Sequence, residues 1–142
     1  MANSVVSGNW TYRSFRNNPE PVGDDPQKAR ELIFGEGQLN ITCNDGRIFK
    51  AALDFGGGFV MDLFGVIYQS TGISPEVLVM TGTGREGTAT AKWVYQYQEY
   101  VVPAWAEGVN QVSAIVGTVI RTIPHGTGTA GVVVSFVAVK KT

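Results

Sequence analysis

The sequence predicts an all-β protein, an antiparallel up-and-down β-barrel of eight or nine strands, with a β-sandwich as the alternative. First, β-branched residues dominate: 19 Val, 12 Thr and 8 Ile stand against 5 Leu, and such side chains suit a pleated sheet. Second, candidate strands separated by glycines recur about every ten residues, as in sandwiches and barrels. Third, two late candidates, residues 88–102 and 111–123, would each reach roughly 40 Å. Closure into a barrel removes the exposed edges of such long strands.

Size and charge narrow the class of protein further. The chain has 142 residues and is 44% hydrophobic, so residues 1–142 are expected to form one domain with its own core. The net charge of −1 provides no basic surface, and we expect neither a nucleic-acid nor a membrane partner. The first ten residues lack the features of a signal peptide, which favours a cytoplasmic location.

The N-terminal part contains one clear strand and one ambiguous segment. Residues 8–16 alternate, with Trp10, Tyr12 and Ser14 on one face. A proline-rich loop follows up to residue 25, long enough to act as a lid or a partner contact. Residues 27–34 either begin as a helical turn after Pro26 or lead directly into a strand over residues 31–34. The strand is the favoured interpretation.

The rest of the chain is read as strands joined by glycine-rich turns. These strands span residues 38–43, 47–55, 59–69, 77–83, 88–102, 111–123 and 129–140. Asn44-Asp45-Gly46 is typical of a two-residue hairpin turn, and no helix of ten or more residues is expected. Gly82-x-Gly84-x-x-Gly87 matches the dinucleotide-binding fingerprint in letters. A strand follows it instead of a helix, however, so we interpret it as a hairpin turn.

The faces of the late strands carry most of the functional information. In residues 88–102, Trp93, Tyr95, Tyr97 and Glu99 share one face, which we expect to point inward. Residues 111–123 and 129–140 are apolar on both faces, so both faces should be covered. A core strand of a sandwich is one explanation. A homo-oligomer, a dimer or a tetramer built through these two strands, is the favoured one.

Gly8-x-Trp10, at the start of the first strand, resembles the signature of the calycins, the lipocalin, fatty-acid-binding and avidin group. The resemblance implies that Trp10 closes one end of the barrel under a late cation, with Arg121 as first choice and Lys140 as second. The segment from Thr88 to Trp93 also resembles the hydroxyl-bearing ligand strand of avidins. Thr88 and Thr90 do not share a strand face with Trp93, so no biotin-binding residues are carried over.

These patterns predict the binding, without catalysis, of a small, mostly apolar or aromatic molecule inside a calycin-like barrel. The expected ligand-binding residues are aromatic, with two polar anchors: Tyr12, Trp93, Tyr95, Tyr97, Glu99 and Arg121. Aromatic linings with a few polar groups are typical of small-molecule sites. No cofactor and no metal ion are expected, because no His, Cys or carboxylate cluster has ligand spacing.

Two other functions stay open. One is a cofactor-free cyclase or isomerase in which Glu99 or Asp62 moves a proton; the other is a structural or assembly protein with a filled barrel. For Glu99, a place in water at the barrel mouth is favoured over a catalytic role, and Asp62 is expected to point outward or to pair with Arg121. His125, the single histidine, lies in a glycine-rich turn, where a solvated side chain is favoured over a catalytic one.

Overall fold

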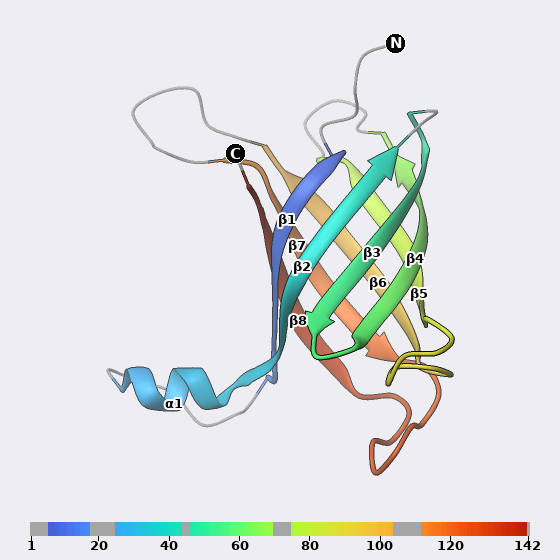
Figure 1. Cartoon of the computed structure of the whole chain (residues 1–142). Helices are drawn as coiled ribbons and strands as arrows, with labels where there is room; N and C mark the ends of the chain where they lie inside the picture. The colour runs from blue at the N-terminus through green and yellow to red at the C-terminus, as the bar shows by residue number, and fades with distance from the viewer. Residues whose placement is uncertain (1–5, 18–24, 44–45, 70–74, 104–111, 142) are drawn as a thin grey trace.

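A computed structural model describes residues 6–17, 25–43, 46–69, 75–103 and 112–141. Eight antiparallel strands follow one another around a closed barrel, in the order of the chain (Figure 1). The last strand pairs with the first, from Trp10↔Lys140 to Phe15↔Ser135, and this pairing closes the wall. The strands are β1 Gly8–Phe15, β2 Ile33–Cys43, β3 Ile48–Gly56, β4 Phe59–Tyr68, β5 Val77–Gly84, β6 Val94–Val102, β7 Ala114–Arg121 and β8 Val133–Lys140. The prediction of an up-and-down barrel is confirmed.

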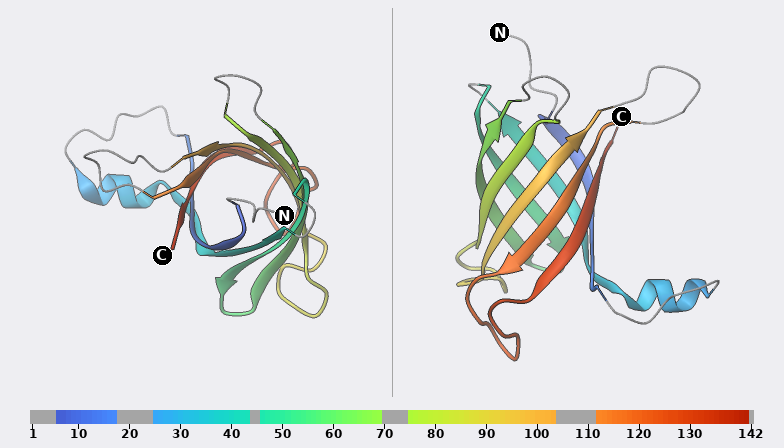
Figure 2. Two further views of the ribbon diagram at one scale, coloured as in Figure 1. Left: turned by 90° about the horizontal axis from the view of Figure 1, so that it is seen from above. Right: turned by 180° about the vertical axis from the view of Figure 1, so that it is seen from behind.

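The segment before β2 differs from the favoured prediction. Pro26–Glu31 forms a helix, α1, and the strand begins only at Ile33. Asp25 caps this helix, because its Oδ1 accepts a hydrogen bond from the Gln27 N–H at 3.0 Å, and proline suits the first helical position. The helix lies outside the barrel wall (Figure 2). Residues 18–24 of the expected lid or partner contact lie outside the described residues.

The two long strands of the sequence prediction are shorter in the structure. β6 begins at Val94, so residues 88–93 connect β5 to β6, and Lys92 adopts a left-handed backbone with φ 71°. β7 and β8 have eight residues each. The barrel therefore closes without the strand length from which closure was inferred; eight short strands in continuous pairing leave no exposed edge.

The predicted inward face is confirmed for the residues of β6, whereas Trp93, which was expected on the same strand face, lies before the strand begins. Tyr95, Tyr97 and Glu99 on β6 are buried, and Gln96 and Gln98 are exposed. On β7 and β8 the inward side chains are Ile115, Val119, Val134, Phe136 and Ala138. The opposite faces of both strands are also apolar and lie on the outside of the barrel.

Trp10 lies in the core near the end of the barrel at which β1 begins. Its side chain is 0% exposed, and its indole N–H donates to the Val6 carbonyl at 2.9 Å. The cation over its ring is Lys140, with Nζ 5.5 Å from the ring centroid. The first choice for this role, Arg121, is wrong, because β7 ends with Arg121 at the opposite end of the barrel. Among the described residues, no helix is long and apolar enough to cross a membrane.

Candidate functional site

A cavity of about 360 Å³ opens at the end of the barrel where β6 begins and β7 ends. This end is the lower one in Figure 1. We call this cavity the mouth cavity. It is lined by Phe34, Gly35, Glu36, Phe55, Phe59, Trp93, Tyr95, Arg121 and His125. Three predicted ligand-binding residues, Trp93, Tyr95 and Arg121, therefore meet at one site.

His125 and Trp93 form the aromatic part of the wall. Their rings stack with centroids 4.1 Å apart and an interplanar angle of 14°. The ring centroid of Phe59 lies 5.9 Å from that of Trp93, and the two rings are tilted against each other. The loop that carries His125 is held by two backbone hydrogen bonds between His125 and Gly128. The expectation of a solvated turn histidine is wrong, since this half-buried ring is fixed against Trp93.

A short polar chain links three side chains of the cavity. The Arg121 Nε–H donates to the Tyr95 hydroxyl at 3.4 Å, and Tyr95 Oη lies 2.6 Å from His125 Nε2. Burial, and secondly the nearby charge of Arg121, lower the pKa of His125. A neutral His125 accepts a hydrogen bond from the Tyr95 hydroxyl at Nε2, so every group in this polar chain has a consistent donor or acceptor role.

The other three predicted residues, Tyr12, Tyr97 and Glu99, are buried in the barrel and do not line the mouth cavity. Phe136 stacks on Tyr12 at 5.4 Å and meets Tyr97 edge-on at 5.6 Å. Burial raises the pKa of Tyr12 to about 12 and that of Tyr97 well above its usual range. Their part in ligand binding stays a prediction.

Glu99 does not lie in water at the mouth, as the favoured interpretation held. Its side chain is 1% exposed, and neither carboxyl oxygen has a hydrogen-bond partner among the described residues. Burial raises the pKa of this carboxyl to about 9, so the group is neutral and protonated at pH 7. An uncharged carboxyl costs far less to bury than a carboxylate.

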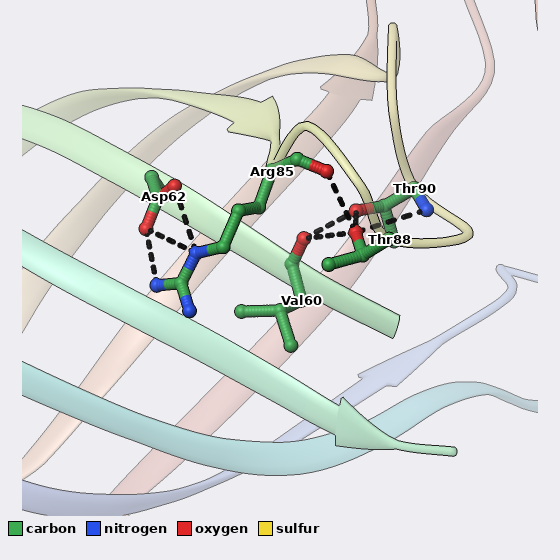
Figure 3. A network of polar contacts seen from close by, with 5 residues as sticks. All are labelled: Val60, Asp62, Arg85, Thr88 and Thr90. Atoms are coloured by element: carbon green, nitrogen blue, oxygen red, sulfur yellow. Dashed lines mark hydrogen bonds and ion pairs between the residues drawn. The ribbon is translucent and has the colours of Figure 1, made fainter. Parts of the chain in front are cut away.

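Asp62 points outward and pairs with Arg85, in contrast to the suggested pairing with Arg121 (Figure 3). Arg85 Nη2 lies 2.6 Å from Asp62 Oδ1, and Nε also donates to the carboxylate. Chiefly through these hydrogen bonds, Arg85 lowers the pKa of Asp62. This exposed pair belongs to the outer wall.

The hydroxyl-bearing segment after β5 has a structural task. Thr88 and Thr90 both donate hydrogen bonds to the carbonyl oxygen of Val60 (Figure 3), and their hydroxyl oxygens lie 2.8 Å apart. These bonds fasten the β5–β6 connection to β4. Trp93 follows directly and is thereby placed at the mouth. Gly84, within the dinucleotide-like pattern, ends β5, and this connection contains no helix, so the match in letters is a turn.

The fold and the cavity together define a class: a closed, eight-stranded, antiparallel up-and-down barrel with an aromatic cavity at one end. Comparison of the chain with protein-family models, curated proteins and solved structures finds no match. Among the described residues, no group of three or more His, Cys, Asp or Glu side chains is placed to hold a metal ion. The mouth cavity is therefore the candidate functional site.

Proposed function

We propose that the protein binds a small, flat, mostly apolar or aromatic molecule in the mouth cavity and does not transform it. One observation carries the proposal: a cavity of about 360 Å³ lined by five aromatic rings, His125 and a single buried cation. Cavities of about 300–1,000 Å³ with an aromatic lining and few polar groups are typical of small-molecule sites. The stacked pair of Trp93 and His125 gives such a ligand a rigid wall.

The calycin resemblance supports a binding protein of this kind. A cation does lie over Trp10, although it is Lys140 and not Arg121. The cyclase or isomerase alternative has weaker support, because Glu99 does not line the cavity and Asp62 is engaged by Arg85 on the outside. Neither carboxyl group lines the mouth cavity.

Titration with N-phenyl-1-naphthylamine, an uncharged flat probe whose fluorescence rises in apolar sites, tests the proposal. We expect saturable binding at one site per chain. Trp93→Leu should weaken it about tenfold or more, because stacking on an aromatic ring is worth roughly 1–3 kcal/mol. The control is Phe64→Leu, which removes an exposed ring from the outer wall of β4. Equal affinity for wild type and Trp93→Leu would place the probe elsewhere and refute the proposal.

A second proposal concerns self-association. The register aligns five outward apolar side chains across neighbouring strands: Tyr68, Val77, Tyr100, Val116 and Val137. We call this row the outer apolar row. It contains no charge, whereas the outer face of β1–β3 carries Arg13, Glu36, Lys50 and Asp54. We propose that a second copy of the chain covers the row, since a two-fold pairing brings an uncharged apolar surface against itself.

A further inference from the structure

Arg121 carries a charge that is almost entirely buried and has no carboxylate partner among the described residues. The residue is 9% exposed. Both of its hydrogen bonds go to neutral oxygens, the Tyr95 hydroxyl at 3.4 Å and the Thr129 carbonyl at 3.3 Å. The ion pairs of the described chain join Arg13 to Glu36 and Arg85 to Asp62. A buried, unpaired charge is costly, so its presence at a cavity wall calls for a counter-charge.

The fold holds the guanidinium group of Arg121 in one place. Its Cζ lies 5.5 Å from the Phe34 ring centroid and 6.0 Å from that of Tyr95. The backbone of Gly128 covers another side, because a Cβ on this glycine would lie 2.6 Å from Cζ. A guanidinium has five N–H donors, and the two bonds above use two of them. The others are available at the wall of the mouth cavity.

The charges around the cavity favour an anion. The exposed guanidinium of Arg16 lies 5.7 Å from the Phe34 ring centroid, so two cations share this ring. Of the residues that line the cavity, only Glu36 is a carboxylate, and Arg13 lies 3.9 Å from it. Burial and Arg121 keep His125 neutral. Arg13 thus partly offsets the negative charge of Glu36, while no carboxylate among the described residues offsets the positive charge of Arg121.

We propose that the ligand is an aromatic anion: a flat ring system with a carboxylate or sulfonate group that accepts N–H bonds from Arg121. The guanidinium fork matches such planar arrangements of oxygens and forms two parallel hydrogen bonds with them. The rings then lie among the aromatic side chains that line the cavity. This inference rests on the proposed binding function and adds the chemical class of the ligand.

The test compares two probes with one ring system, 1-anilinonaphthalene-8-sulfonate and uncharged N-phenyl-1-naphthylamine. The uncharged probe is the more apolar, so burial alone favours it. We expect the sulfonate to bind wild type at least about tenfold more tightly, as hydrogen bonds to a charged group imply. In Arg121→Met the ratio of the affinity for the sulfonate to the affinity for the uncharged probe should fall about tenfold or more relative to wild type.

Two controls separate the possible outcomes. Lys50→Met removes an exposed cation from the outer wall of β3 and should change neither affinity. Should Arg121→Met not fold, Arg121→Lys, which keeps the charge and loses the guanidinium fork, takes its place: the ratio of the two affinities should fall in this variant too. Saturable binding of both probes without a sulfonate preference, or a preference that survives in Arg121→Met, overturns the anion inference and leaves the binding function standing. Binding of both probes that is insensitive to Trp93→Leu overturns the binding function as well.

Discussion

At the scale of single residues, Glu99 is the most unusual group in the barrel. In the register it lies between Leu78 on β5 and Gly117 on β7. A side chain on Gly117 would collide with the backbone of Gln98 and Glu99, so glycine is required beside this carboxyl. A glycine inside a strand pattern predicts either a bend of the sheet or a close backbone approach, and Gly117 is a place of close approach.

Glu99 should make stability fall as the pH rises. Burial raises the pKa of its carboxyl from 4.5 to about 9 in the folded protein. The folded protein therefore favours the protonated carboxyl more than the unfolded chain does. The resulting contribution to the free energy of unfolding is complete below pH 4.5. It is lost progressively up to about pH 9, by at most about 1.4 kcal/mol per pH unit. Urea unfolding at pH 5 and pH 8 measures the difference, which should amount to a few kcal/mol.

The matched variant for this measurement is Glu99→Gln, which has no proton to lose. Its stability should depend much less on pH, so at pH 8 it should equal or exceed that of wild type. The difference between the two proteins removes the contribution of all other titrating groups. Identical slopes for both would show that Glu99 is already ionised in the folded protein.

Trp10 should be the most costly aromatic side chain to remove. Trp10→Ala is expected to lower the free energy of unfolding by about 3–5 kcal/mol, as for other buried aromatic residues. Lys140→Met should cost only about 0.5–2 kcal/mol, the value of a cation–π contact. Chemical denaturation measures both. A loss below about 1 kcal/mol for Trp10→Ala would contradict its place in the core.

At the scale of secondary-structure elements, alternation predicted which side chains of β6 point inward but not where β6 begins. Alternating residues 88–93 satisfy the strand pattern as well as residues 94–102 do. The segment nevertheless turns, because the hydroxyls of Thr88 and Thr90 bind the backbone of β4. Local hydrogen bonds of this kind compete with sheet pairing. Similarly, the side chain of Asp25 caps a helix over Pro26–Glu31, where the sequence pattern favoured a strand.

The attachment of this connection can be tested by Thr90→Val, which keeps the shape and removes the hydroxyl. We expect a loss of about 1 kcal/mol of stability, the net value of one hydrogen bond, because the Val60 carbonyl retains its bonds from Arg85 and Thr88. Thermal unfolding gives the shift, and Thr83→Val, at an exposed position of β5, is the control. Equal effects of the two substitutions would deny Thr90 this role.

The mouth cavity was only half predictable for a related reason. Antiparallel strand order alone implies that the start of β6 and the end of β7 meet, which brings Tyr95 and Arg121 together. The contribution of His125 depends on the path of the β7–β8 connection, which places its ring on Trp93. No periodicity describes such a path. One feature of the sequence could have indicated this contact. Pro124 and Gly126 mark a turn after β7, and this turn lies at the barrel end where Trp93 precedes β6.

At the scale of the whole molecule, the barrel has a charged outer side and an apolar one. Arg13, Glu36, Lys50 and Asp54 lie on the outer face of β1–β3, Asp62 lies on that of β4, and the outer apolar row crosses β4–β8. The sequence pattern predicts association through β7 and β8 alone. Val134 on β8 is 3% exposed and points inward, so its substitution by lysine would disrupt the core and say nothing about association.

A residue of the outer apolar row is therefore the better test. Sedimentation at micromolar concentration should show wild type as a dimer or larger, above the chain mass of 15.3 kDa. Tyr100→Glu should shift it to the monomer, because it places a charge in the centre of the apolar contact. The control is Thr42→Glu on the charged side, which should leave the assembly intact. A wild-type monomer at this concentration refutes the proposal.

The packing of the barrel interior prevents a ligand from passing from one end of the barrel to the other. Around Gly82, a side-chain carbon would already touch Tyr97, Met61 and Leu63 at 3.2–3.4 Å, and Trp10 is packed near the far end. The mouth cavity is thus closed at its inner end, so a bound molecule would enter and leave through the same opening. Any substituent too large for the cavity would then protrude from that opening into the solvent.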